Sequence, residues 1–220
     1  MLNLRAVAMR LGAATHDYRA AVPGLLMMLV GPRIGDALNF VYNLLLVRWL
    51  GEAQYGQAAA ILSAIGIPSA ALGVLICRET VWLTEANDHA ALLRYVWRWF
   101  WRVGTAAALV GVGVIFLSPY VGTIFRYEHA STTYALAAMI VATAVGPLWG
   151  SVIQGQKRFL LLGSIPVAQG MVRVALTAAL LYLGLQVTGV LYAQFLSMSF
   201  VIMWCVLAAR KPVAVAGSAH

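Results

Sequence analysis

Six apolar segments, separated by short polar connections, make up most of this chain. They cover about residues 24–47, 56–77, 96–118, 132–154, 160–184 and 187–209. Each is close to the roughly 20 residues that an α-helix needs to cross the hydrocarbon core of a bilayer. No segment shows the ten-residue alternation of apolar and polar positions that is typical of membrane β-strands. The pattern predicts an all-α, polytopic membrane protein in which residues 24–209 form six transmembrane helices.

The composition favours the same class of protein. The 220 residues are 62% hydrophobic and 10% charged, and the mean hydropathy is +0.85. A soluble domain has about 45–50% apolar and 25% charged residues. The net charge of +8 would suggest nucleic-acid binding in a soluble protein, but the enrichment of basic residues in cytoplasmic connections explains it better here. We therefore expect membrane lipid as a partner and no nucleic acid.

The positions of the basic residues predict the orientation of the helices. With the N-terminus in the cytoplasm, eleven of the fifteen basic residues fall on the cytoplasmic side, namely Arg5, Arg10, Arg19, Arg78, Arg94, Arg98, Arg102, Lys157, Arg158, Arg210 and Lys211. The opposite side has only Arg48 and Arg126, and Arg33 and Arg173 lie within spans. Because basic residues favour cytoplasmic connections, this asymmetry predicts that both termini are cytoplasmic.

Two short regions flank the predicted spans. Residues 1–23 lack an apolar stretch of the length that a signal peptide needs. Their apolar residues recur at helical spacing among basic ones, which predicts an amphipathic arm on the membrane surface. Residues 210–220 are expected to form a cytoplasmic tail.

A run of alternating basic and aromatic residues precedes the third span. Residues 94–102 read RYVWRWFWR, with an arginine at every fourth position. Such a run could stack on nucleic-acid bases. Tryptophan and arginine are also the residues that a spanning helix places at headgroup depth, and we favour this membrane-anchor interpretation.

The first span carries an unusual set of polar residues. Arg33, Asp36, Asn39 and Asn43 follow one another at intervals of three, three and four residues, which places them on one side of a helix. One interpretation is a local ion pair between Arg33 and Asp36 that satisfies itself. The other is a wall of a binding cavity, because polar groups within a membrane usually mark a pathway or site.

A second intramembrane cation lies in the fifth span. Arg173 follows Gln169 by one turn and lies roughly 20 Å from the cytoplasmic end of this span, near the middle of the bilayer. An ion pair with Asp36 would compensate its charge, and this pairing is compatible with a cavity. Arg33 and Arg173 lie within the spans with Asp36 as the acid well inside one, so positive charge is in excess there. An anionic ligand such as a phosphate would complement this excess.

The sequence contains no recognisable constellation for catalysis. The four histidines lie outside the spans and have no metal-binding spacing, and no nucleotide-binding or nucleophile motif is present. The acids and histidine between residues 79 and 89 are more typical of a solvated loop than of a catalytic site. We expect neither enzymatic activity nor a cofactor.

Three short motifs occur in order along the chain. Residues 48–56 (RWLGEAQYG) fit R-x-L-G-x-x-x-Y-G, residues 73–79 (GVLICRE) have glycine, an apolar run and Arg-Glu, and residues 154–159 (QGQKRF) fit Q-G-x-x-R-F. A short connection precedes Val187–Val190. In order and spacing these motifs resemble those of the bacterial polysaccharide and oligosaccharide flippases, which belong to the multidrug/oligosaccharidyl-lipid/polysaccharide exporter superfamily.

The resemblance implies that the chain is the N-terminal six-helix lobe of such a flippase. It implies translocation of a polyprenyl-pyrophosphate-linked oligosaccharide or polysaccharide precursor across the bacterial inner membrane by alternating access. In this family, basic residues in a central cavity hold the pyrophosphate and sugars. By position, Arg33 is the first candidate for that contact and Arg173 the second. The candidate substrate-binding residues are Arg33, Asp36, Asn39, Asn43, Gln169 and Arg173. The motifs imply structural or gating roles for Arg48, Gly51, Tyr55, Gly56, Arg78, Glu79, Lys157 and Arg158.

The chain departs from the family in having one lobe. Family members usually have twelve or more helices in two lobes with the cavity between them, and residues 210–220 resemble a truncated interlobe linker. We therefore expect a second six-helix lobe, from another copy or a separate chain. Two other functions stay open. One is a cation-coupled multidrug exporter of the same superfamily, with Asp36 as its coupling acid. The other is a non-transporting membrane subunit of a glycan-assembly complex.

Overall fold

The computed structural model describes residues 4–66, 70–86, 88–125 and 130–210. All the regular structure in these ranges is α-helical. The helices are α1 (Leu4–Gly66), α2 (Ala70–Glu85), α3 (His89–Phe116), α4 (Ser118–Phe125), α5 (Ala130–Gly155), α6 (Phe159–Tyr182) and α7 (Gln186–Ala209). The predicted tail lies outside this description apart from Arg210, as do the side chains of residues 1–21 in the predicted N-terminal arm.

Five stretches of helix in the described chain are long and apolar enough to cross a membrane. They are Val22–Ser63 in α1, all of α3, Ser131–Gly155 in α5, α6 and α7. The boundaries predicted for the last three spans agree with those of α5, α6 and α7 within two residues. The all-α class is therefore confirmed, and the lengths and apolar character of these helices indicate a membrane protein.

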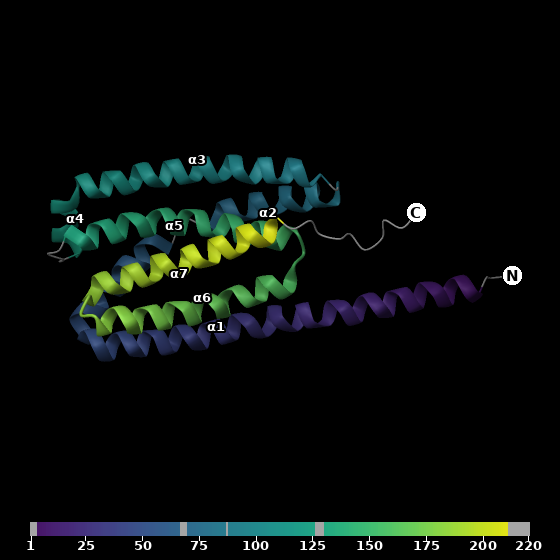
Figure 1. Ribbon diagram of the computed structural model, residues 1–220, viewed down its shortest axis with the longest axis horizontal. Coiled ribbons are helices and arrows are strands. Elements are labelled where there is room, and N and C mark those ends of the chain that lie inside the picture. The colour runs from purple at the N-terminus through teal and green to yellow at the C-terminus, as the bar shows by residue number, and fades with distance from the viewer. Residues whose placement is uncertain (1–3, 67–69, 87, 126–129, 211–220) are drawn as a thin grey trace.

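The helices lie side by side in the order α3, α5, α7, α6 and α1, with α2 packed on α3 and α5 (Figure 1). In the most apolar window of α5, 56% of the residues are buried, compared with 6% for α1. The largest buried cluster accordingly centres on Leu148, Trp149, Val152 and Ile153 of α5. Helix α5 forms the core, and α1 lies at the edge of the bundle.

Helix α1 contains a sharp change of direction at Gly51. This residue has φ 77° and ψ 170°, a backbone conformation that is essentially restricted to glycine. Tyr42 and Leu46, before the kink, belong to the same apolar cluster as Ala58, after it. In a straight helix, Tyr42 and Ala58 would be about 24 Å apart, so the chain folds back, as Figure 1 shows. The motif at residues 48–56 thus forms the bend of a helical hairpin.

The predicted second span, residues 56–77, is described in two parts, because residues 67–69 lie outside the described residues. Its first part belongs to α1, which ends at Gly66, and its second part belongs to α2, which begins at Ala70. The second span as a single helix therefore stays a prediction.

Three other boundaries differ from the expectations. Helix α1 begins at Leu4 and continues into the first span, so the predicted surface arm is not separate from it. Helix α3 begins at His89, before the predicted start at residue 96, because the Asp88 carboxylate caps it by accepting from the Ala91 amide at 2.8 Å. Helix α4 was not predicted. Its Pro119 lies in the first turn, where a missing N–H is tolerated.

Helices α1 and α6 pack through small residues. An added Cβ on Gly31 would meet the backbone of Gly163, and one on Gly163 would meet the backbone of Met27 and Met28. One turn further along, an added Cβ on Gly35 would lie 2.8 Å from Cβ of Pro166. Small residues at a helix–helix contact let two backbones approach closely within a membrane. This glycine seam therefore fixes how α6 lies against α1.

Gly51→Ala is expected to lower the free energy of unfolding by about 1–3 kcal/mol, because alanine does not tolerate this backbone conformation. The added Cβ would meet no atom within 4 Å, so the cost arises from the backbone alone. Gly56→Ala is a matched control, since it also meets no atom but has a helical backbone. It is expected to stabilise slightly. Thermal unfolding in detergent measures both, and equal effects would contradict the role of the Gly51 kink.

Candidate functional site

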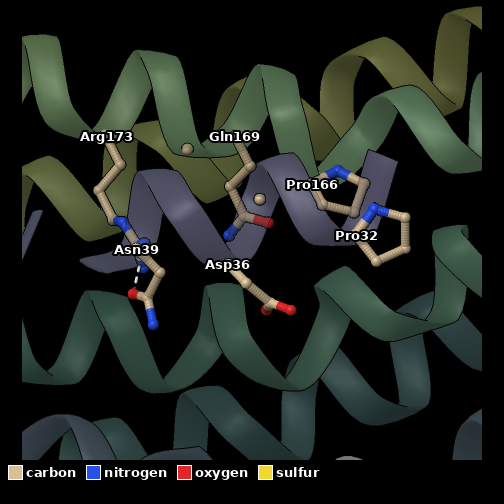
Figure 2. Close-up of a pocket in the computed structure, with 8 residues that line it drawn as sticks. Pro32, Asp36, Asn39, Pro166, Gln169 and Arg173 are labelled. Atoms are coloured by element: carbon tan, nitrogen blue, oxygen red, sulfur yellow. Dashed lines mark hydrogen bonds between the residues drawn. The ribbon is translucent and has the colours of Figure 1, made fainter. Parts of the chain in front are cut away.

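A cavity of about 350 Å³ lies between the middle parts of α1 and α6 (Figure 2). Its lining residues are Pro32, Gly35, Asp36, Asn39, Pro166, Gln169, Gly170 and Arg173. Two of them, Gly35 and Pro166, also belong to the glycine seam between α1 and α6. The cavity thus combines a rigid small-residue wall with four polar side chains.

Arg173 is held in this cavity by uncharged groups. Its Nη2 donates to Oδ1 of Asn39 at 2.7 Å, and its Nη1 donates to Oε1 of Gln194 at 3.4 Å. Its Cζ lies 4.2 Å from the centre of the Tyr42 ring, within the range of a cation–π interaction. The Nε atom is buried and has no hydrogen-bond partner. The guanidinium is therefore fixed in position by two of its five N–H donors, and its Nε donor is unused.

The acid of the cavity does not neutralise this arginine. In the described residues Asp36 forms its ion pair with Arg33, with 3.8 Å between Nη1 and Oδ2. Figure 2 shows the Asp36 carboxylate on the side of the cavity away from Arg173. The proposed Arg173–Asp36 ion pair is therefore not formed, because Asn39 occupies the position opposite the guanidinium. Arg173 keeps an uncompensated positive charge beside the cavity.

The four polar residues that the sequence placed on one side of the first span do not all reach the cavity. Asp36 and Asn39 line the cavity, whereas Arg33 does not, and its side chain is 86% exposed. At 100° per residue, Arg33 lies about 120° around the helix from Asn39. Asn43 shares the face of Asn39 but lies one turn beyond, where its amide donates to the Asn39 carbonyl at 2.8 Å. Of the six sequence candidates, the structure brings Asp36, Asn39, Gln169 and Arg173 to one cavity.

Two residues of the site were not identified from the sequence. Tyr42 is only 2% exposed and supports the Arg173 guanidinium with its ring. Gln194 comes from α7, a third helix, and bonds the other side of the guanidinium. Gln194 could have been noticed as a polar residue within an apolar span. Tyr42 carried no such signal, since aromatic residues are ordinary in spans.

Residues 48–56, which form the bend of α1, contact the site only indirectly, through side-chain packing. Tyr55 is half-buried and packs on the cluster that contains Tyr42 and Leu46. Gly51 supplies the kink, while Arg48 and Gly56 are exposed. Tyr55 therefore connects the bend of α1 to the aromatic ring beneath Arg173. In α2, Arg78 is exposed and Glu79 is half-buried, and both lie away from the residues that line the cavity.

The turn at residues 154–159 joins α5 and α6 to two other helices. Lys157 adopts φ 57°, and its Nζ lies 3.0 Å from Oε1 of Glu85 in α2. Arg158 donates from Nη1 to the Ala208 carbonyl at 2.7 Å, near the end of α7. Partial burial lowers the pKa of the Arg158 guanidinium. These contacts give Lys157 and Arg158 a structural position at one end of the bundle, away from the cavity.

Metal binding has no basis in the described part of the chain. No three His, Cys, Asp or Glu side chains there come together in a way that could hold a metal ion. The cavity offers one carboxylate, already paired with Arg33, and the amides of Asn39 and Gln169. Its chemistry suits the binding of an anion by Arg173 and of hydroxyl groups by the amides.

Comparisons of the chain with protein-family models, with curated proteins and with solved structures find no match. The flippase resemblance therefore rests on the three short motifs, and the candidate site rests on its geometry.

Proposed function

We propose that this chain is one lobe of a transporter that moves a polyprenyl-pyrophosphate-linked oligosaccharide or polysaccharide precursor across the bacterial inner membrane. A second six-helix lobe, from another copy or a separate chain, would close the cavity during alternating access. The observation that carries the proposal is the uncompensated charge of Arg173, held by neutral partners in a cavity between two apolar helices.

The depth of Arg173 argues against a purely structural role, because placing a charged side chain there costs free energy. It lies about 21 Å from the start of α6 and about 14 Å from its end, at 1.5 Å per residue. An arginine this deep costs at least about 2.5 kcal/mol on insertion scales. Asn39, Gln194 and Tyr42 orient the guanidinium without neutralising it. A pyrophosphate would supply the missing negative charge and accept two parallel hydrogen bonds.

The surroundings suit a substrate that is polar at one end and apolar at the other. The amides of Asn39 and Gln169 line the cavity and can bind sugar hydroxyls. Outside the cavity, α1 exposes the large apolar residues Leu29, Phe40 and Leu44. A polyprenyl tail can lie along such a surface while it remains in the bilayer. A polar cavity beside an exposed apolar helix surface supports a lipid-linked glycan as the substrate over a fully soluble one.

The arrangement of the helix ends supports the predicted orientation. In Figure 1, α1 begins and α7 ends at the same end of the bundle, and α3 and α6 begin there too. Most of the basic residues of the connections fall at these positions. A cytoplasmic location of this end follows from the positive-inside rule.

The test is binding and translocation by the full chain reconstituted in vesicles. The probes are a fluorescent oligosaccharide on polyprenyl pyrophosphate and the same oligosaccharide on neutral polyprenol. We expect the pyrophosphate-linked probe to bind at least tenfold more tightly, because charged hydrogen bonds contribute about 1.5–3 kcal/mol, and to cross the vesicle membrane. Equal binding of the two probes would contradict the proposal.

The cation-coupled exporter is the second candidate, because Asp36 lines the cavity. The pairing of Asp36 with Arg33 weakens it, since a coupling acid must be free to exchange protons. The same vesicles discriminate between the two. Uptake of a cationic dye under a pH gradient, without binding of the pyrophosphate-linked probe, would favour the exporter. Binding of neither probe, with no dye uptake, would favour a non-transporting subunit.

A further inference from the structure

Three arginines form an exposed row on α3, well away from the cavity. Arg94, Arg98 and Arg102 follow one another at intervals of four residues, and all are exposed. Successive members are about 6 Å apart along the helix axis, so the row extends for about 12 Å. The opposite face of α3 is buried, with Leu92 and Val96 in the main apolar cluster. The arginine row therefore points outward from the bundle.

No carboxylate of the described chain pairs with this row. Of the acids near this part of α3, Glu85 binds Lys157 at 3.0 Å and Asp88 caps the Ala91 amide. Glu79 acts electrostatically on Tyr95 but forms no ion pair with the row. The two ion pairs found among the described residues involve neither Arg94, Arg98 nor Arg102. Three positive charges thus stand together without internal compensation, and their complement is an anionic partner.

Aromatic rings hold this surface in place. Trp97 stacks on Phe100 with 4.7 Å between ring centres, and it meets Trp101 edge-on at 6.1 Å. Trp97 also contacts the buried Trp149 of α5 at 6.2 Å, which ties the cluster to the core. Cζ of Arg102 lies 5.8 Å from the centre of the Trp99 ring. The arginines are therefore presented from a rigid aromatic base.

The length of α3 places the row at the membrane surface. Its 28 residues span about 42 Å, compared with about 30 Å for the hydrocarbon core. If its C-terminal 20 residues cross the core, the crossing begins near Trp97, and the exposed Trp97 and Trp101 lie at the interface that tryptophan prefers. Arg94 and Arg98 then lie beside the lipid phosphates, and Arg102 reaches them by snorkelling.

We propose that Arg94, Arg98 and Arg102 form a binding site for the headgroup of an anionic phospholipid. Guanidinium groups bind phosphate oxygens in pairs, and phospholipid phosphates lie at the depth of this row. The aromatic side chains beside it can contact the glycerol and upper acyl chain. This site is independent of the proposed transport function, since none of its residues lines the cavity.

The experiment measures lipid preference by the full chain in neutral detergent. Brominated phosphatidylglycerol and brominated phosphatidylcholine with the same acyl chains are titrated, and quenching of tryptophan fluorescence reports binding. We expect phosphatidylglycerol to bind at least tenfold more tightly. Replacing all three arginines by glutamine should weaken its binding on the order of a hundredfold, and Arg98→Gln alone about fivefold, because each surface arginine contributes a similar increment.

The matched control replaces Arg48, Arg78 and Arg210, three exposed arginines elsewhere, by glutamine. It removes the same charge and should leave the preference intact. The proposal is overturned if this control loses the preference equally, or if the α3 triple variant keeps it. Equal competition by soluble glycerol phosphate would also overturn it, because the site would then recognise free phosphate rather than a lipid. Arg98→Gln provides the same test if the triple variant does not fold.

Discussion

Gly163→Ala is expected to force α6 away from α1 and to lower the free energy of unfolding by about 3 kcal/mol or more. The added Cβ would meet the backbone carbonyl of Met27 and would lie 2.8 Å from the Met28 nitrogen. Backbone atoms within a helix cannot move aside as a flexible side chain can. Overpacking of a well-packed contact typically costs about 1–3 kcal/mol, and here two helix backbones must separate. Chemical unfolding in mixed micelles measures the change.

Two other glycines provide a graded control for this prediction. Gly146 faces the side chain of Met198, whose Sδ lies 3.0 Å from an added Cβ, and Gly113 meets no atom within 4 Å. Gly146→Ala should cost less than Gly163→Ala because methionine can change its rotamer. Gly113→Ala should be neutral or slightly stabilising, as alanine favours a helix. If all three alanine variants behaved alike, the close backbone approach would not be what holds α1 and α6 together.

Arg173→Gln is expected to abolish tight binding of the pyrophosphate-linked probe while the protein still folds. The loss should be about 10- to 150-fold, which corresponds to the 1.5–3 kcal/mol of a charged hydrogen bond. The stability should change little, because losing the bonds to Asn39 and Gln194 is offset by removing a charge from a low-dielectric region. Probe titration and thermal unfolding of the same preparation separate the two effects.

Arg33→Gln is the matched control, since it removes the other intramembrane arginine. The Arg33 side chain is exposed and lies outside the cavity, so binding should weaken less than threefold, within the range of a surface ion pair. Arg173→Lys adds a test of geometry. Lysine keeps the charge but lacks the planar fork, so binding should be intermediate. A larger loss for Arg33→Gln than for Arg173→Gln would place the anion site on the outer face of α1 instead.

The helices were the most predictable part of the structure. A spanning helix needs a certain length of apolar sequence whatever it packs against, so α5, α6 and α7 were located within two residues. The same reasoning failed where a helix begins in polar sequence before its apolar stretch. The Asp88 cap begins α3 at His89, seven residues before the predicted start of the apolar span.

The candidate site was predictable only in part. Polar residues in apolar segments are conspicuous, so Asp36, Asn39, Gln169 and Arg173 were identified without a structure. Helical periodicity grouped Arg33 with them, although it lies about 120° around the helix from Asn39. Tyr42 was not identified, because a ring that supports a guanidinium looks like any other apolar residue until the two are seen in contact.

The sequence by itself therefore determined the helical class, most of the apolar spans and the polar residues that a membrane would not tolerate without a reason. The tertiary structure decided which of those residues meet. Arg173 bonds Asn39 and Gln194, which are 134 and 21 positions away in the sequence. That meeting depends on the glycine seam between α1 and α6 and on the packing of α7 against α6. Such contacts arise from the close fit of several helices, which no periodicity along one helix encodes.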